Sequence, residues 1–176
     1  IDDYRALRAV SCGRTRRCVA IDSAGNIVEL HHGKALHEVS CATRSMCMAV
    51  GVHSSMLRDG HWRQIPDPAG ESQLDDVTCL HETYCVAGGA HGFYVWNHGT
   101  WSAPIVRGNL LNAWVACTSE RRCFGTQDNG AAMSGYRFDG AASAYFTNDS
   151  VGWTTIECRP HSTCISVDLD TVTIGH

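Results

Sequence analysis

Large apolar residues recur at fixed distances before five pairs of cysteines that share the spacing C-x5-C. The residue two positions before each first cysteine is always aliphatic: Val10, Val39, Val77, Val115 and Ile156. Four units have a second apolar residue five positions before it: Leu7, Leu36, Leu74 and Trp153. In the fourth unit the corresponding residue, Leu111, stands one position early. This pattern predicts that every unit opens with a β-strand.

The residues after each second cysteine alternate in size. The second unit continues Met48, Ala49, Val50, and the third continues Val86, Ala87. Such a period of two predicts a second strand with one face of small and one of large side chains. Sheets of this kind can stack, because the large side chains of one sheet fill the room beside the small face of the next.

Turn sequences predict a third strand in the units and a fourth strand in the three middle ones. Asp59-Gly60, His98-Gly99 and Asp139-Gly140 supply the positive φ angles of tight hairpins, and the strand after two of them carries Trp62 or Trp101. Four-stranded antiparallel units of about forty residues, repeated radially, are the blades of a β-propeller. We therefore predict an all-β fold, a five-bladed β-propeller of short antiparallel blades, with one intra-blade disulfide per blade.

The repeat also predicts the domain boundaries. We expect one domain over residues 1–176, with blades at about 7–35, 36–73, 74–109, 110–149 and 150–176. Blade five ends after its third strand, so residues 1–5 are expected to supply its outer strand and close the ring. The short spacing of the first unit predicts that blade one lacks a fourth strand.

All ten cysteines belong to the repeated pairs, which are Cys12/Cys18, Cys41/Cys47, Cys79/Cys85, Cys117/Cys123 and Cys158/Cys164. An even number and local pairing predict disulfides formed in an oxidising compartment, outside the cell or in a periplasm. Zinc is the alternative, but structural zinc sites favour two to four residues between paired cysteines. Each disulfide closes a short loop and is therefore expected to add roughly 2 to 2.5 kcal/mol to the free energy of unfolding.

Composition narrows the class of protein. An apolar content of 44% with 18% charged residues is typical of an ordered globular domain. The net charge of −4 argues against a nucleic-acid partner. The longest apolar run is far too short for a membrane span, so we expect any signal peptide or membrane anchor to lie outside this sequence.

Basic residues concentrate in the loops between paired cysteines. Seven of the fourteen Lys and Arg residues lie there: Arg14, Arg16, Arg17, Arg44, Arg121, Arg122 and Arg159. Because these loops should open on one face of a propeller, we predict a basic face, with acids such as Asp67, Glu71, Asp75 and Asp76 on the opposite face. Such a disc can orient on an anionic membrane or cell-wall surface.

No catalytic group and no metal site are expected from the motifs. The histidines are scattered, and neither a nucleophile elbow nor a zinc-protease motif occurs. Asp75-Asp76 and Asp168/Asp170 are weak calcium candidates, since solvated loop acids are commoner. Trp62 and Trp101 suit either sugar stacking or packing between blades, and packing is favoured.

Two segments are candidates for self-association into a weak homodimer. The first is the third strand of blade one, with Ile27, Val28 and Leu30, which would lack a partner strand. The second is Ala141 to Phe146, an uncharged run whose Tyr145 and Phe146 are expected to project as an arm.

Units of the form Val-Ser-Cys-x5-Cys-Val/Met-Ala, such as Val10-Ser11-Cys12 with Cys18-Val19-Ala20, resemble repeats of exported actinobacterial proteins. The whole chain resembles the extracellular sensor domain of mycobacterial transmembrane serine/threonine protein kinases. The resemblance implies a cytoplasmic kinase domain using ATP and Mg²⁺, one membrane helix, and this domain outside the membrane. No kinase motif occurs in this chain, so no cofactor is expected here.

We therefore expect a non-enzymatic sensor that regulates its kinase through an unknown ligand or through dimerisation. The main alternative is a secreted carbohydrate-binding propeller, and a small hydrolase comes third.

Overall fold

The computed structural model describes residues 7–12, 18–22, 36–43, 45–105, 112–128, 133–138, 143–147, 153–158, 164–168 and 172–175. Side chains are described at 9, 11, 20–21, 36–43, 45–105, 112–126 and 158. Over these residues the structure consists of β-strands and turns. No helix among them is long and apolar enough to cross a membrane.

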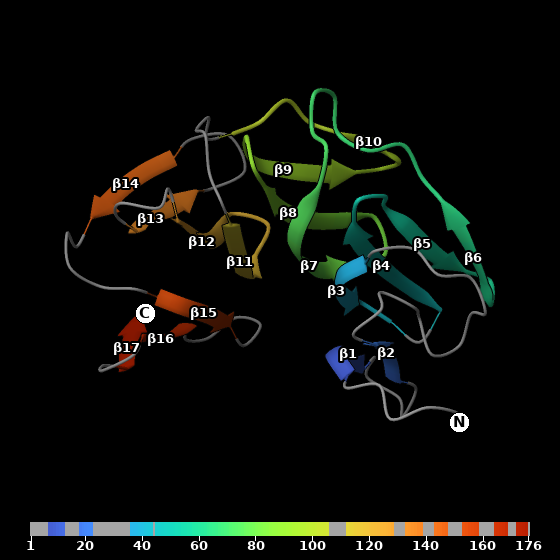
Figure 1. The fold of residues 1–176 in the computed structure, drawn as a ribbon, viewed down its shortest axis with the longest axis horizontal. Coiled ribbons are helices and arrows are strands. Elements are labelled where there is room, and N and C mark those ends of the chain that lie inside the picture. Colours follow the sequence, from blue (N-terminus) through green and yellow to red (C-terminus); the bar gives the residue numbers. More distant parts are fainter. Residues whose placement is uncertain are drawn as a thin grey trace.

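Five antiparallel sheets follow one another around a common axis (Figure 1). The strands nearest the axis are β1 (Leu7–Cys12), β3 (Leu36–Cys41), β7 (Leu74–His81), β11 (Asn112–Ser119) and β15 (Trp153–Cys158). The second strands are β2 (Cys18–Asp22), β4 (Met46–Gly51), β8 (Tyr84–Gly89), β12 (Arg122–Asp128) and β16 (Cys164–Asp168). The third strands are β5 (Ser55–Arg58), β9 (Gly92–Asn97), β13 (Met133–Phe138) and β17 (Val172–Gly175). The fourth strands are β6 (His61–Gln64), β10 (Thr100–Trp101) and β14 (Ser143–Thr147). The predicted fold, an all-β five-bladed propeller, is confirmed.

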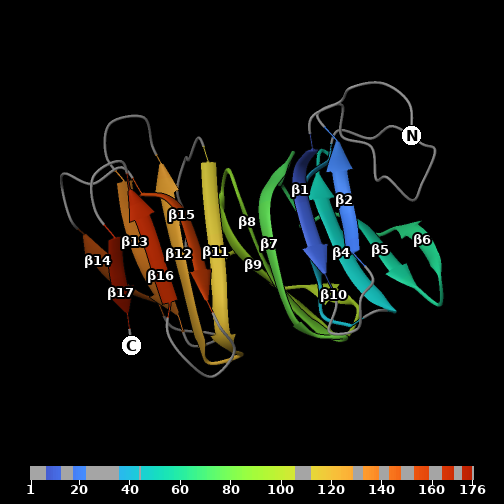
Figure 2. The ribbon, with the colours of Figure 1, turned by 90° about the horizontal axis from the view of Figure 1, so that it is seen from below.

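The inner strands pack against one another in chain order from β1 to β15. In the edge-on view of Figure 2, strands β1 and β11 run in the same direction. The inner strands therefore end at the same face of the disc, and the described hairpins between paired cysteines open there.

The blades form an arc, because β15 does not pack on β1 as consecutive inner strands pack on each other (Figure 1). Among the described residues, blade five has the three strands β15, β16 and β17, which agrees with the prediction that this unit itself supplies three strands. Two other predictions, the closing segment at residues 1–5 and the unpaired third strand of blade one, lie outside the described residues.

Large side chains of one blade fill the space beside small residues of the next. Phe93 of β9 is fully buried, and a methyl group added to Gly125 of β12 would lie 2.3 Å from its Cζ. A methyl group added to Gly88 would lie 2.8 Å from the Cβ of Ala113 in the next blade. The predicted stacking of large faces on small faces is thus present between blades three and four.

The two outer-strand tryptophans also pack between blades. Trp101 contacts Trp96 edge-on, with ring centroids 5.2 Å apart, and its Nε1 donates to the carbonyl of Pro66 in blade two at 2.9 Å. Trp62 packs on the core between blades one and two. Both observations confirm the predicted packing of these tryptophans between blades.

Disulfides join the first two strands of the blades. Bridges are formed by Cys41–Cys47, Cys79–Cys85 and Cys117–Cys123, with Cα atoms 4.0 Å apart in each. Cys158 is also disulfide-bonded, and it lies opposite Cys164 in the strand register. Cys12 lies opposite Cys18 in the same way. These bridges indicate an oxidising, extracellular-type environment.

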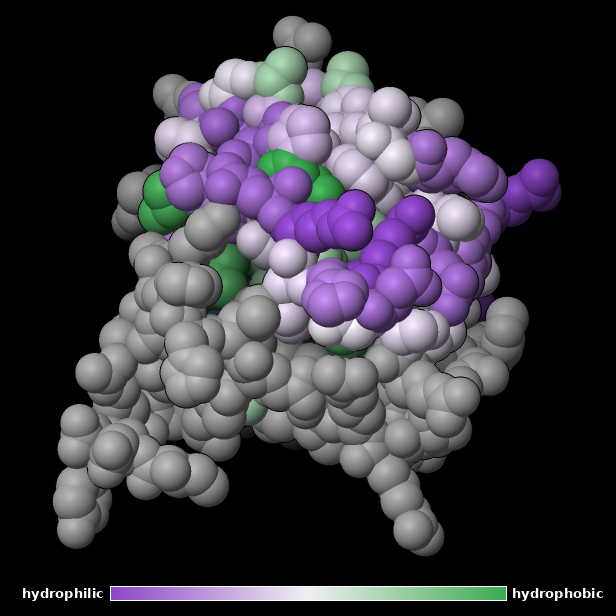
Figure 3. All heavy atoms as spheres, turned by 90° about the vertical axis from the view of Figure 1, so that its right-hand side faces the viewer, coloured by the Kyte–Doolittle hydropathy of each residue, from purple (hydrophilic) through white to green (hydrophobic). Residues whose placement is uncertain are grey.

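The predicted hairpin turns adopt the left-handed backbone. Asp59 and Gly60 have φ angles of 52° and 79°, and His98 and Gly99 have φ angles of 49° and 98°. Beyond the first of these turns, the edge strand β6 exposes His61, Arg63 and Gln64. The side of the molecule that carries this blade is mainly hydrophilic in its described part (Figure 3), as suits a protected sheet edge.

The prediction that Ala141 to Phe146 project as an arm is wrong for the described residues of this segment. Residues from Ser143 onward form β14, in which Tyr145 lies opposite Tyr136 and Phe146 lies opposite Gly135. A run rich in aromatic and small residues pairs readily with a neighbouring strand, so this segment is the outer strand of blade four. The other dimer candidates, Ile27, Val28 and Leu30, lie outside the described residues.

Candidate functional site

A β-bulge interrupts the inner strand of four blades at the same place. In blade two, Leu36 lies opposite Gly51 and Glu38 lies opposite Val50, which leaves His37 without a partner. The same irregularity falls at Asp75 in blade three. In blades one and five it falls at Arg8 and Thr154. In every case the bulged residue is four positions before the first cysteine.

The bulge changes which side chains face the axis. In a regular strand consecutive side chains point to opposite faces, but an extra residue breaks that alternation. Consequently both members of the pairs His37-Glu38 and Asp75-Asp76 line one pocket. The flanking apolar residues, such as Leu74 and Val77, are still buried between blades.

Blade four reaches the same arrangement without a bulge at this place, since the irregularity of its inner strand falls between Cys117 and Ser119. Ala113 lies opposite Gln127, the register position that Leu36 and Leu74 occupy in their blades, and it is fully buried. Ala113 therefore takes the core position that the sequence pattern assigned to Leu111, which lies outside the described residues. With regular alternation, Asn112 and Trp114 both line the axial pocket.

The pocket has a volume of about 430 Å³. Seven described residues line it: His37, Glu38, Gln73, Asp75, Asp76, Asn112 and Trp114. They stand at the beginnings of the inner strands, so the pocket lies at the face opposite the hairpins between paired cysteines. Its volume is within the range of small-molecule sites.

Both aspartates of the pocket join blade three to blade four. Asp76 accepts the backbone N–H of Val115 at 2.6 Å and that of Val77 at 2.8 Å. Asp75 accepts the backbone N–H of Ala113 at 3.2 Å and the side-chain amide of Gln73 at 2.9 Å. These carboxylates are therefore held in place by amides of the protein rather than being the solvated loop acids that the sequence suggested.

The environment of Asp75 is electrostatically unfavourable for its charge. Burial raises the pKa of its carboxyl above the ordinary value of 3.8, against the opposing effects of the bonds from Gln73 and Ala113 and of nearby His37. The Nδ1 atom of His37 is 3.9 Å from Asp75 Oδ1. Within the described part of the chain, no group of three or more His, Cys, Asp or Glu side chains is placed to hold a metal ion.

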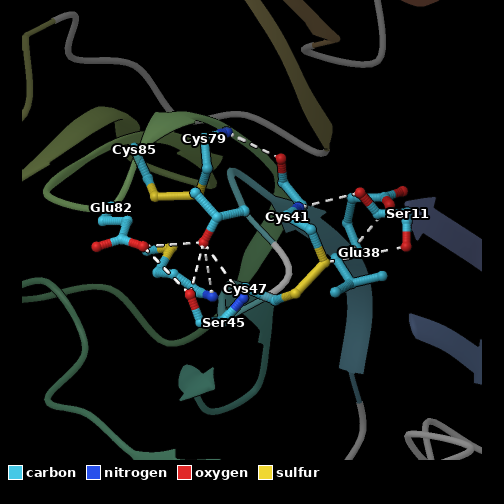
Figure 4. The surroundings of a disulfide bond; sticks show 12 residues. Ser11, Glu38, Cys41, Ser45, Cys47, Cys79, Glu82 and Cys85 are labelled. Atoms are coloured by element: carbon cyan, nitrogen blue, oxygen red, sulfur yellow. Dashed lines mark hydrogen bonds between the residues drawn. A yellow bond between two sulfur atoms is a disulfide. The ribbon is translucent and has the colours of Figure 1, made fainter. Parts of the chain in front are cut away.

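Serines of the Val-Ser-Cys motif connect consecutive blades, a role that the sequence did not reveal. Ser11 Oγ accepts the backbone N–H of Cys41 at 3.0 Å (Figure 4), and Ser40 Oγ accepts that of Cys79 at 2.9 Å. The signal in the sequence is the serine that precedes the first cysteine in two consecutive units, at Ser11 and Ser40. Together with Asp75 and Asp76, they fix the spacing of the inner strands around the pocket.

The face of the inter-cysteine hairpins carries acids as well as the predicted arginines. Arg121 is exposed there and Arg122 is half-buried, whereas the other five predicted arginines lie outside the described residues. In the same hairpins Glu82 accepts the hydroxyls of Thr43 at 3.0 Å and Ser45 at 3.3 Å, and Glu120 pairs with His81 (Figure 4 shows Glu82). These acids offset part of the positive charge that the arginines give to this face.

The chain matches no protein-family model and no curated protein sequence. Its fold resembles solved propellers. The WD40 β-propeller domain of Doa1 superposes with a TM-score of 0.69 at 12% identity, over 99% of this chain and 66% of that one. YCF48 from Cyanidioschyzon merolae superposes with a TM-score of 0.63 at 12% identity, over 99% of this chain and 72% of that one. XC5397 of Xanthomonas campestris, described as a gluconolactonase, superposes with a TM-score of 0.64 at 13% identity, over 98% of this chain and 73% of that one.

The chain thus spans about two thirds to three quarters of the length of these propellers. At such low identities the likeness concerns the fold alone. On the strand order, the disulfides and these superpositions, the chain is a β-propeller with a polar pocket at its axis.

Proposed function

We propose that this propeller is the extracellular sensor domain of a receptor-type serine/threonine protein kinase. The observation that carries the proposal is the axial pocket, which gives a disulfide-linked scaffold a place to receive a ligand. The C-x5-C repeats, which resemble those of exported actinobacterial proteins, support the connection to a membrane kinase. Ligand binding, or association of two tethered copies, would regulate the kinase domain.

An antiserum raised against this domain tests the proposal. It should capture from detergent-solubilised membranes a polypeptide much longer than 176 residues that incorporates phosphate from ATP on serine or threonine. Peptide mass mapping of that band should find kinase sequences and this propeller in one chain. A captured protein without a kinase domain would overturn the proposal.

Dimerisation is the second route of regulation that we propose, because two tethered copies in contact would bring two kinase domains together. Strand β14 is the outermost strand of its sheet in the described part of blade four, and an outer strand is where a second copy would pair. Sedimentation of the purified domain should show weak, concentration-dependent association. A monomer at all concentrations would leave ligand binding as the route.

A further inference from the structure

Three carboxylates line the axial pocket beside one aromatic side chain. Glu38, Asp75 and Asp76 come from two neighbouring blades, and Trp114 comes from a third. No lysine or arginine is among the described side chains that line it. A ligand that fits must therefore tolerate or offset a concentrated negative charge.

The indole of Trp114 gives the pocket a second kind of contact. Its side chain is half-buried at the axis, and it is not among the residues that form the described cores between blades. An aromatic face near carboxylates suits a cation that carries apolar carbon, because the π-face attracts the charge while the ring packs on the methylenes. The amides of Gln73 and Asn112 add polar contacts around it.

The pocket is also built with defined geometry. Asp75 and Asp76 are each held by backbone amides of β11, which fixes their carboxylates relative to Trp114 on the same strand. The bulges at His37 and Asp75 place two consecutive side chains from each strand in the pocket. Bulges commonly occur where a strand must direct a side chain toward a binding site.

We propose that the axial pocket binds an alkylammonium group, either of a free short-chain diamine or of a lysine side chain in a peptide. This inference rests on the proposed role as a ligand-binding domain and names the class of ligand. The ammonium group lies between the carboxylates of Glu38 and Asp75, and the attached methylenes lie on Trp114. Binding a cation offsets the cost of burying the Asp75 charge.

Calorimetric titration of the purified, oxidised domain with cadaverine at low salt tests the proposal. Cadaverine should bind, and 1,5-pentanediol, its neutral analogue, should not. Added salt should weaken binding, because it screens the charges. A blocked lysine, N-acetyl-lysine methylamide, distinguishes the two sources: tighter binding than cadaverine indicates a peptide ligand, and weaker binding indicates a free amine.

Variants locate the site. Asp75→Asn and Glu38→Gln should each weaken cadaverine binding about tenfold or more, and Trp114→Leu should weaken both amine probes. Glu82→Gln, which removes an acid from the opposite face, is the matched control and should bind as the wild type does. Thermal unfolding and disulfide mapping of each variant separate loss of binding from loss of fold.

Equal binding of pentanediol or glucose would overturn the proposal in favour of a neutral polyol or sugar, and so would no binding of either amine. These outcomes are independent of the kinase capture experiment. A domain that binds amines but is captured without a kinase would retain the ligand class and overturn only the receptor-kinase role.

Discussion

At the scale of single residues, the contact between Phe93 and Gly125 shows how closely two blades approach. The ring occupies the space where any side chain at 125 would begin. Gly125→Ala should lower the free energy of unfolding by about 1–3 kcal/mol, the usual cost of overpacking a core. Denaturant unfolding of the oxidised protein measures this loss.

Two further variants make that test specific. Gly60→Asn lies in an open turn with a left-handed backbone that asparagine tolerates, so it should change stability little. Adding Phe93→Leu to Gly125→Ala should cost less than the sum of the two single changes, because the smaller side chain relieves the clash. Strict additivity would contradict the described contact.

Asp75 predicts a dependence of stability on pH. Because burial raises its pKa above 3.8, the folded state binds the proton more tightly than the unfolded state does. This group therefore favours folding at low pH, and its contribution is lost as the pH rises from about 4 through the raised pKa. Asp75→Asn, which keeps an acceptor for Ala113 N–H, should be more stable than the wild type at pH 7.

The difference in stability between Asp75→Asn and the wild type should shrink toward pH 3.5, because the carboxyl of Asp75 becomes protonated in the folded wild type. Thermal unfolding across this range measures it. Asp59→Asn, an exposed turn residue, controls for the removal of one negative charge. A variant that is less stable than the wild type at every pH would show that the hydrogen bonds of Asp75 outweigh its desolvation.

At the scale of the strand pair, each disulfide closes one hairpin. Replacing Cys79 and Cys85 together by serine should lower the free energy of unfolding by roughly 2 kcal/mol from chain entropy alone. Cys85 is fully buried, so a serine hydroxyl there adds a desolvation cost. Chemical denaturation of the double variant, compared with the wild type, gives the value.

The strands and their faces could be predicted because the repeat supplies the same pattern five times. The bulge was not predicted, although the sequence carries a signal for it. The apolar residues of each inner strand, such as Leu36 and Val39, are three positions apart, as are Leu74 and Val77. Regular alternation cannot place two residues with this spacing on one face. The pocket was missed for the same reason. The sequence alone favours a solvated loop acid at Asp76, because the partner of its carboxylate, the backbone N–H of Val115, lies one blade away.

At the scale of the whole molecule, the arginines of the inter-cysteine hairpins predict binding to anionic vesicles. Each basic residue near such a surface contributes about 1 kcal/mol, and the attraction fades beyond a Debye length. Wild-type protein should co-sediment with anionic vesicles at low salt. Changing Arg14, Arg16, Arg17, Arg121 and Arg122 to alanine should abolish this binding.

The acids on the same face offer the opposite test. Glu82→Gln with Glu120→Gln should strengthen vesicle binding, because the change removes two negative charges from the hairpins that carry the arginines. Neutral vesicles serve as the control for both variants. Equal binding by the wild type and the arginine variant would mean that this face does not meet the membrane.

The bulge on the inner strand has a consequence for how such a chain can diversify. It separates the positions that hold blades together from the positions that face the axis. Within this one chain the packing positions stay apolar, whereas the pairs that line the axial pocket differ between blades, being His37-Glu38 in blade two and Asp75-Asp76 in blade three. Duplicated units can thus acquire new recognition chemistry while conserving their architecture, and directed evolution could randomise these pairs to obtain binders for other ligands.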